Sequence, residues 1–335
     1  MGASLVRGFS FSPPPGLRLA GGRLSSRSTT RVTVLFKVVF PVLLIAALGF
    51  VAQPYLHLDA RSLSRITFYF FSPALVLDSL SNSTLGGAEF GRIALAVVFV
   101  TLALWVLAAL VVRALRLDGA AESGFLLATL FVNAGNYGLP VTLFAFGEAG
   151  LAIATVYFAT SSMIQSSLGV YLAARGNANA WQAAQATLRV PLVYAALLGL
   201  LLNTTNTALP PSLAKSVSLL GRAAIPVMLM VLGVQLANLL AGRTQHVKAV
   251  VRPLAVTTAI RLLIGPTLGL AVAVLLGLQG LSRNVVIVES AMPTAVMTII
   301  LATEYRAEPE FVTTAVFTST VVSVVTITGI LTLLA

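Results

Sequence analysis

One polar stretch inside an apolar segment decides how this chain can fold. It reads Phe131-Val132-Asn133-Ala134-Gly135-Asn136-Tyr137-Gly138-Leu139-Pro140-Val141. The surrounding segment, residues 123–147, has no Asp, Glu, Lys or Arg and is long enough to cross a bilayer as a helix. Pro140 has no backbone N–H and clashes with the preceding turn, while Gly135 and Gly138 lower the cost of an unwound path. We therefore expect the helix to break here, with Asn133 and Asn136 free to satisfy the backbone or to bind a ligand.

The composition of the whole chain points to lipid as its solvent. Of 335 residues, 58% are hydrophobic and 9% are charged, and the mean hydropathy is +0.97. Soluble domains carry about 25% charged residues, so these charges are too few to cover a water-soluble surface. The chain has no cysteine and two histidines, which excludes disulfides, thiolate metal sites and a histidine metal cluster. The net charge of +11 is scattered between apolar runs and forms no basic face for nucleic acid.

Ten segments are candidates for membrane spans. Two of them carry one acid each: residues 66–80 contain Asp78, and residues 284–303 contain Glu289. The other eight contain no Asp, Glu, Lys or Arg: residues 38–56, 93–112, 123–147, 151–174, 190–214, 223–242, 262–282 and 311–335. Alternating strands are absent, and every backbone polar group in lipid must be satisfied internally. We therefore expect an all-α membrane protein with ten transmembrane helices.

The basic residues between the spans indicate the topology. The even-numbered loops hold four basic residues, and the loops after spans one, three, five, seven and nine hold ten: Arg61, Arg65, Arg113, Arg116, Arg175, Arg189, Arg243, Lys248, Arg252 and Arg306. By the positive-inside rule the odd-numbered loops are cytoplasmic and both termini lie outside. We expect a multi-pass protein of the bacterial inner (cell) membrane.

The tail at residues 1–33 and the basic residue after it conflict with this assignment. Together they hold six basic residues up to Lys37, and no acid precedes Asp59, so counting them outside would give ten on each side. Three interpretations stay open: an organellar transit peptide, translation that starts near Val32 or Val34, or a disordered extension.

Prolines at matched places suggest an internal repeat. Three pairs keep nearly constant offsets: Pro41 with Pro191 (150), Pro73 with Pro226 (153) and Pro140 with Pro293 (153). We expect two five-helix halves, residues 34–174 and 190–335, joined by a cytoplasmic linker at residues 175–189. Five is odd, so the second half would be inverted relative to the first, as in many secondary transporters.

The ninth span carries a break at the place that matches the first. It reads Glu289-Ser290-Ala291-Met292-Pro293-Thr294-Ala295. Two interrupted helices in corresponding positions of two halves indicate a transporter's binding site, and their half-helix N-termini suit an anion. The predicted substrate-binding residues are Asn133, Gly135, Asn136, Gly138, Pro140, Arg261, Pro293 and Thr294. The alternative for each break is a proline kink packed against a neighbour.

Charged and hydroxyl residues within the spans suggest ligand and ion roles. The Arg261 fork could hold a carboxylate, and Glu289 and Asp78 are candidates for ion coupling. The alternative is an ion pair of Arg261 with one of these acids. Small polar residues in the fifth span, such as Ser161 and Gln165, either allow close helix packing or line a cavity or a Na⁺ site. The aromatic stretch Phe68, Phe70 and Phe71 is interpreted as a lipid-facing or packing surface.

The motif at residues 133–140, and Ala291-Met292-Pro293 followed by Leu301-Ala302-Thr303-Glu304-Tyr305, resemble the auxin efflux carrier family, which includes bacterial malonate and malate permeases. The resemblance covers roughly residues 34–335 and implies a fold akin to bile acid:sodium symporters. Spans four and nine would be crossover helices, with Asn133 and Pro140 matching the first motif and Pro293 the second. Spans one, two, six and seven would form a scaffold that carries the dimer contact in relatives. The long cytoplasmic loop of some plant members is absent.

These observations predict a secondary active transporter of small organic anions such as carboxylates, working by alternating access. We expect no cofactor, coupling to H⁺ or Na⁺, the lipid bilayer and a small organic anion as partners, no nucleic acid, and a homodimer through the scaffold helices. No Gly-rich nucleotide-binding loop occurs, and no catalytic constellation is visible, so we expect neither ATP hydrolysis nor an enzyme. The alternative is an ion channel or a membrane sensor on the same scaffold.

Overall fold

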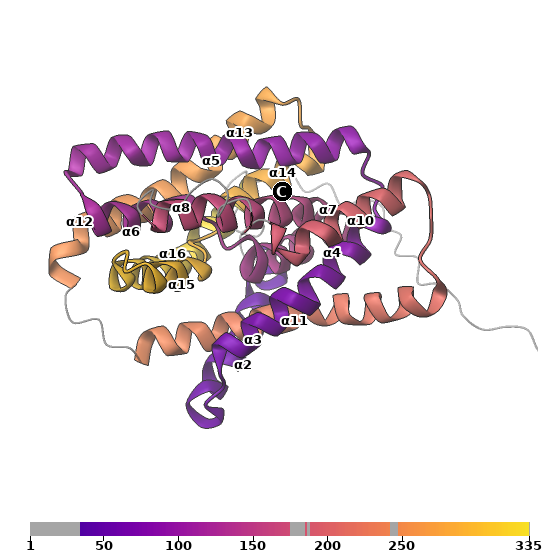
Figure 1. Ribbon diagram of the computed structural model, residues 1–335, viewed down its shortest axis with the longest axis horizontal. Helices are drawn as coiled ribbons and strands as arrows, with labels where there is room; N and C mark the ends of the chain where they lie inside the picture. The colour runs from indigo at the N-terminus through magenta and orange to yellow at the C-terminus, as the bar shows by residue number, and fades with distance from the viewer. Residues whose placement is uncertain (1–33, 175–184, 186–187, 242–246, 335) are drawn as a thin grey trace, which may run out of the picture.

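The computed structural model describes residues 34–174, 185, 188–241 and 247–334, and this part of the chain is helical with short connections (Figure 1). In chain order the α-helices are α2 (Phe40–Leu56), α3 (Ala60–Ile66), α4 (Ser72–Ser81), α5 (Gly87–Leu115), α6 (Gly119–Leu130), α7 (Leu139–Ile164), α8 (Val170–Ala173), α10 (Pro191–Thr204), α11 (Pro211–Ala241), α12 (Val247–Ala259), α13 (Gly265–Leu275), α14 (Gly280–Ser290), α15 (Met297–Glu304) and α16 (Pro309–Leu334). Five wider, π-helical turns adjoin them: η1 (Leu35–Val39), η2 (Thr67–Phe71), η3 (Ala134–Gly138), η4 (Gln165–Gly169) and η5 (Ile260–Ile264). The expected tail (1–33) and most of the expected linker (175–189) lie outside the described residues.

Six helices of the described chain are long and apolar enough to cross a membrane, so a multi-pass all-α membrane protein is confirmed. They are Phe36–Leu56, Gly87–Leu115, Ala134–Ala173, Pro211–Ala241, Val251–Leu275 and Pro309–Leu334. Ten were expected, and the difference has physical causes. Helices α6, α14 and α15 are short because the chain unwinds beside them, and α10 has 14 residues. The ten-helix inverted repeat stays a prediction.

The expected boundary between the fourth and fifth spans lies at a kink within α7. Gly147 has φ 68°, a left-handed conformation that glycine adopts without steric cost, so the helical run Ala134–Ala173 bends there. Large apolar side chains that point outward, such as Tyr55 and Leu275, leave the bundle with a lipid-compatible surface.

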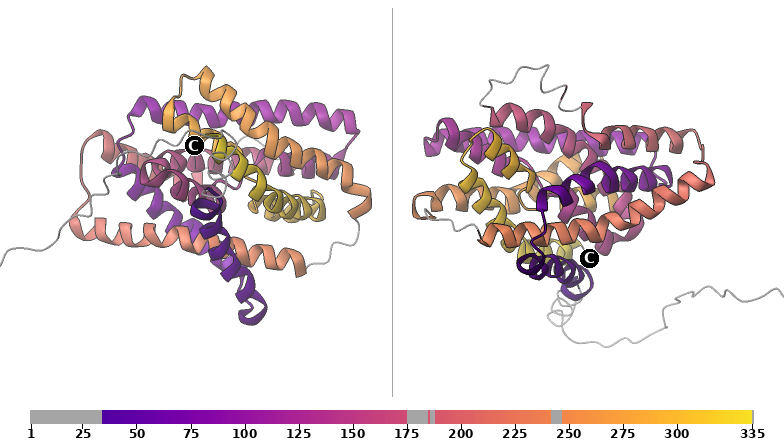
Figure 2. Two further views of the ribbon diagram at one scale, coloured as in Figure 1. Left: turned by 180° about the vertical axis from the view of Figure 1, so that it is seen from behind. Right: turned by 60° about the horizontal axis from the view of Figure 1, so that its bottom comes forward.

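Helices α5 and α11 run along opposite sides of the molecule, α5 in purple and α11 in salmon (Figures 1 and 2). Helix α2 packs closely across α11. A Cβ on Gly49 would collide with the carbonyl of Met230, and one on Gly233 with that of Ala46, so the two helices approach as closely as their backbones allow. The buried core between these outer helices is formed by α6, α7, α13 and α14. This core positions the candidate site.

Candidate functional site

The two segments that the sequence singled out are unwound and lie against each other. Residues 131–133, between α6 and η3, and residues 291–296, between α14 and α15, leave the helical conformation. We call these two segments the break pair. Val132 and Thr294 face each other in an isolated antiparallel bridge. The Asn133 N–H donates to the Pro293 carbonyl at 2.8 Å, and the Ala295 N–H donates to the Phe131 carbonyl at 2.9 Å.

Arg261 lies where the carbonyl ends of α6 and α14 converge. Its Nη1 donates to the carbonyl oxygens of Thr129 (3.0 Å) and Leu130 (3.1 Å), and its Nη2 donates to that of Ser290 (2.7 Å). The last carbonyls of a helix have no N–H partner within it and carry partial negative charge. Arg261 is 0% exposed, so its guanidinium satisfies groups that water cannot reach.

Thr294 makes further hydrogen bonds at the carbonyl end of α6. Its Oγ1 donates to the carbonyl of Ala128 at 2.8 Å, and its N–H donates to Ser319 Oγ at 3.1 Å. Nearby, the Tyr157 hydroxyl and Ser290 Oγ lie 3.1 Å apart. The carbonyl ends of the two broken helices are therefore closed by the protein's own donors.

The amino ends of the helices that follow the breaks are arranged differently. In η3 the first backbone bond is from Gly138 N–H to the Asn133 carbonyl, at 3.0 Å, so the N–H groups of residues 134–137 have no partner within the helix. In α15 the bonds begin with Thr298, which leaves the N–H groups of Val296 and Met297 ahead of the first helical bond. Both amino ends line one pocket.

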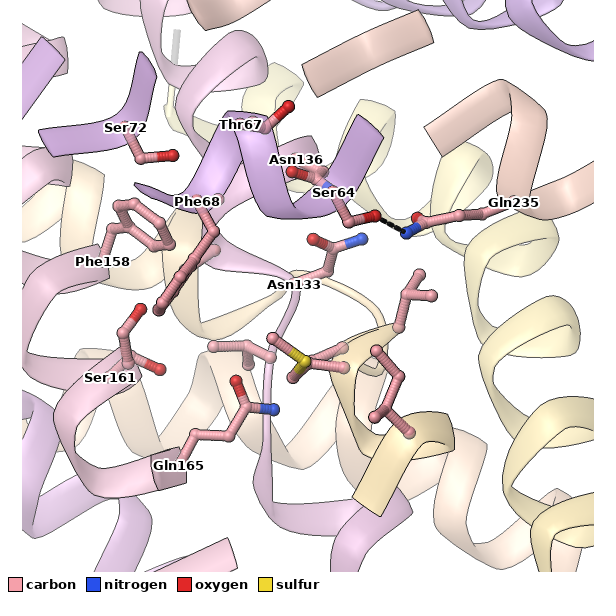
Figure 3. Close-up of a pocket in the computed structure, with 18 residues that line it drawn as sticks. Ser64, Thr67, Phe68, Ser72, Asn133, Asn136, Phe158, Ser161, Gln165 and Gln235 are labelled. Carbon is pink, nitrogen blue, oxygen red and sulfur yellow. Dashed lines mark hydrogen bonds between the residues drawn. The ribbon is translucent and has the colours of Figure 1, made fainter. Parts of the chain in front are cut away.

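This pocket is small, has a mixed polar and apolar lining, and is built from five parts of the chain (Figure 3). Its cavity volume is about 100 Å³, which suits a small ligand. Among the described residues that line it none is charged: they are Ser64, Thr67, Phe68, Ser72, Val132, Asn133, Ala134, Gly135, Asn136, Phe158, Ser161, Ser162, Gln165, Gln235, Ala295, Val296, Met297 and Ile300. Figure 3 shows the Asn133 amide in the middle, with Gln235 and Ser64 on one side and Gln165 on the other.

Three amide groups in this pocket have unused hydrogen-bonding capacity. Asn133 Nδ2, Gln165 Nε2 and Gln235 Oε1 are buried and have no protein partner, although Gln235 Nε2 donates to Ser64 Oγ at 3.1 Å. A buried polar group without a partner is costly, so native structures rarely keep one without a reason. The three unpartnered amides therefore make this pocket the candidate binding site.

Glu289 lies beside the pocket rather than in it. Its Oε1 accepts a hydrogen bond from Thr142 Oγ1 at 2.8 Å, while Oε2 has no partner and the residue is 0% exposed. The Gly138 Cα packs on this carboxyl group, and a Cβ there would collide with Oε2. Because Arg261 bonds to carbonyl groups and Glu289 to Thr142, the alternative of an Arg261–Glu289 ion pair is not what the structure shows.

The structure brings some of the predicted site residues together and separates others. Asn133, Gly135 and Asn136 line the pocket. The buried residues Gly138, Pro140, Pro293 and Thr294 shape the backbone around the break pair without lining the pocket. Arg261 lies on the carbonyl side, where its Nη atoms are already bonded. Asp78 is half-buried in a separate polar cavity with Asn82 and Asn203, away from the break pair.

Several lining residues were missed or left undecided by the sequence. Ser161 and Gln165 line the pocket, which favours the cavity interpretation of these residues over packing alone. Phe68 packs against the core and also lines the pocket, whereas Phe70 is exposed, so both parts of the lipid-facing or packing interpretation occur in this stretch. Ser64, Thr67 and Ser72 follow helical spacing, and this stripe of hydroxyl residues is a signal that could have found them.

The wide helical turns gather at this site. Of the five in the described chain, η2, η3 and η4 each contribute lining residues and η5 carries Arg261. Single π-helical turns are rare and often lie at functional sites. No residue pattern predicted these turns, because they depend on how neighbouring helices pack.

A bundle of apolar helices with an uncharged pocket at two unwound segments is the arrangement expected of an integral membrane transport protein. A family model described as "Membrane transport protein" matches residues 34–189 and 182–331. The chain therefore belongs to this transporter family, the auxin efflux carrier family, and is not an enzyme.

Relatives from archaea and plants are similar to this chain. An "Uncharacterized transporter" of Methanothermobacter thermautotrophicus is 27% identical over 296 residues, covering 87% of this chain and 95% of the relative. Another transporter, from Methanocaldococcus jannaschii, is 26% identical over 300 residues, covering 87% and 96%. "Auxin efflux carrier component 3a" of Oryza sativa subsp. japonica is 30% identical over 137 residues, covering 38% of this chain and 21% of the carrier.

Proposed function

We propose that this protein is a secondary active transporter of small organic anions such as carboxylates, and that the anion binds in the pocket at the break pair. The observation that carries the proposal is the convergence of two helix amino ends and two unpartnered amide donors on one uncharged pocket. Helix amino ends offer free N–H groups and partial positive charge, which favour an anion. A cation would find no carboxylate among the described lining residues.

The same proposal includes the ten-helix, inverted-repeat architecture with spans four and nine as crossover helices. The Val132–Thr294 bridge supports it, because it joins the two breaks that the proline offsets relate. The lining residue Ser64 lies just before span two, in the basic loop after span one, and Gln235 lies in the half of span seven that leads to the next odd-numbered loop. With those loops in the cytoplasm and both termini outside, the pocket would open inward, as one state of an alternating-access cycle in a bacterial inner membrane.

For coupling we propose H⁺ at Glu289, with Na⁺ as the alternative. A fully buried carboxyl group with one unpartnered oxygen, packed on Gly138 of the break, is placed to gain or lose a proton as the site rearranges. Asp78 was the other candidate, and its distance from the break pair makes it the weaker one. We also propose a homodimer through the scaffold helices, whose exposed apolar side chains include Leu44 and Leu48 on α2.

The substrate class is tested by a matched pair of ligands. We expect malonate to raise the melting temperature of the purified protein and to show saturable uptake and counterflow in proteoliposomes, because a ligand that binds the folded state stabilises it. Malonamide has a similar shape without the charge and should do neither. Malate, succinate and indole-acetate extend the series. Stabilisation by cationic ligands alone would refute the anion site, and current that does not saturate would favour the channel.

Coupling is tested by Glu289→Gln, which keeps the shape of the side chain and removes its titration. We expect uptake by the parent protein to depend on an imposed pH gradient and uptake by the variant to lose this dependence. Asp78→Asn is the control and should keep it. If Glu289→Gln responds to the gradient as the parent does, H⁺ coupling at this residue is excluded.

A further inference from the structure

Arg261 hydrogen-bonds to the two broken helices at once, and on both helices it donates to backbone carbonyls. Its guanidinium donates to Thr129 and Leu130 at the end of α6 and to Ser290 at the end of α14. These residues directly precede the two segments of the break pair. The arginine itself comes from a third element, the wide turn η5, so it holds two separate helices from outside both of them.

The geometry requires an arginine rather than any cation. A guanidinium is planar and presents five donors in a fixed fork, whereas a lysine ammonium is a single point charge. Here two nitrogen atoms of the fork reach three carbonyls on two helices. The carbonyl ends carry the negative part of the helix dipole, so the positive charge is matched by the ends it joins.

The neighbouring helix is shaped to leave room for this contact. A Cβ on Gly265 would lie 2.6 Å from Arg261 Nη2 and 2.7 Å from the Ser290 carbonyl oxygen. One turn later, a Cβ on Gly269 would lie 2.7 Å from Ser290 Oγ. Helix α13 can therefore approach α14 over the guanidinium only because it presents glycine at both positions.

We propose that Arg261 is a positioning residue of the transport site: it ties the carbonyl ends of α6 and α14 together and so keeps the break pair in register, with both amino ends facing one pocket. This differs from a ligand to the transported anion, because Arg261 does not line the pocket and both its Nη atoms already donate to backbone carbonyls. The effect on ligand affinity rests on the proposed function; the effect on the break pair does not.

The register of the break pair can be measured directly, because the chain has no cysteine of its own. The bonds that flank Val132 and Thr294 make them a non-hydrogen-bonded antiparallel pair, whose Cα atoms lie about 4.5 Å apart in such ladders, within disulfide range. The experiment introduces Val132→Cys and Thr294→Cys together in the full chain and follows oxidant-driven crosslinking in detergent.

We expect rapid crosslinking when Arg261 is present. With Arg261→Met the rate should fall at least about tenfold, a factor expected from losing one charge-assisted hydrogen bond, and Arg261→Lys should recover part of it. Two controls should crosslink as the parent does. Arg252→Met removes an exposed arginine of α12, and Gly49→Ala destabilises the α2–α11 contact without touching the break pair.

Crosslinking in Arg261→Met at the parent rate would overturn the proposal, as would failure of the parent pair to crosslink. If Arg261→Met does not fold, Arg261→Lys is compared instead by hydrogen exchange at the N–H groups of Asn133 and Ala295, which should exchange faster than in the parent. Malonate binding is also measured for Arg261→Met and Arg261→Lys without the cysteine pair. This measurement separates the positioning role of Arg261 from the proposed transport of an anion. Loss of binding with unchanged crosslinking would make Arg261 a ligand to the anion, whereas failure of the parent to bind any carboxylate would refute only the transport proposal.

Discussion

The two sides of the break pair contrast in how they satisfy the ends of the broken helices. On the carbonyl side, Arg261 and Thr294 donate to the last carbonyls of α6 and α14. On the amino side, the first N–H groups of η3 and α15 face a pocket whose amides Asn133 Nδ2 and Gln165 Nε2 have no protein partner. Unwinding the two segments thus leaves carbonyl groups without partners on one side and N–H groups without partners on the other. The protein's own donors bond to the carbonyl groups, whereas the N–H groups face the pocket.

This contrast shows how the proposed anion could be bound by a pocket whose described lining residues carry no charge. Had a mobile arginine lined the pocket, its charge would have to be neutralised by something else whenever the ligand left. Here the full positive charge is fixed on the carbonyl side, and the ligand meets only partial charges and amide donors. Closed ends should therefore matter for stability, and open ends for binding.

The largest expected effect comes from disturbing the closed side with Gly265→Ala. The added Cβ would need to occupy space 2.6 Å from Arg261 Nη2 and 2.7 Å from a backbone oxygen of α14. Overpacking of this kind typically costs about 1–3 kcal/mol, which exceeds the usual gain of about 0.5–1 kcal/mol from replacing a helical glycine. We expect a lower melting temperature of the purified protein by differential scanning fluorimetry.

Gly329→Ala on α16 is the matched control, because nothing lies within 4 Å of a Cβ at that position. It should keep or raise the melting temperature. Equal behaviour of Gly265→Ala and Gly329→Ala would show that α13 does not approach the guanidinium as described.

An intermediate and opposite effect is expected on the open side with Asn133→Leu. The substitution removes a buried, unpartnered Nδ2, so the ligand-free protein should be as stable as the parent or more stable, by up to about 1 kcal/mol. Ligand binding should weaken by at least about tenfold, since one hydrogen bond to a charged group is lost. Both effects are read from melting curves over a malonate titration.

Asn284→Leu is the control for this substitution. Asn284 also has a buried unpartnered amide oxygen, but it lies on α14 outside the pocket, so the variant should bind malonate as the parent does. Strong destabilisation of the ligand-free protein by Asn133→Leu would mean that Asn133 belongs to the closed side.

The sequence predicted the breaks but not what each side of them does. Proline, glycine and asparagine inside an uncharged segment located both unwound segments, because these residues act on the local backbone. The role of Arg261 could not be predicted in the same way. Its partners are the backbone carbonyls of Thr129, Leu130 and Ser290, and every residue type has a backbone carbonyl, so the sequence of these partners carries no signal.

The pocket was predicted in part for a similar reason. Asn133, Gly135 and Asn136 belong to the broken segment itself and were found. Ser64 and Gln235 come from helices far away in the chain, and their position depends on the packing of α3 and α11 against the core. Asp78 drew attention as an acid in an apolar segment, yet it lies at the end of α4 in a separate cavity.

The smallest effect is expected at a helix amino end that the protein closes with its own anion, outside the spans. Asp59 caps α3: its carboxylate accepts hydrogen bonds from the Ser62 hydroxyl and from the Arg61 and Ser62 N–H groups. These bonds lower the pKa of Asp59 below its ordinary value, and the bond from the Ser62 hydroxyl contributes most. A lowered pKa means that the cap stabilises the fold fully above the ordinary pKa and loses this contribution as pH falls through the folded-state pKa.

Asp59→Ala should therefore lower the melting temperature slightly and by a constant amount between about pH 7 and pH 5, and the difference from the parent should narrow below about pH 4. The measurement is a pair of melting curves at each pH. A difference that stays constant below pH 4 would show that the cap needs only an oxygen acceptor. A narrowing difference would show that a helix amino end in this protein gains from negative charge, which is the property that the open ends at the break pair are proposed to offer to the transported anion.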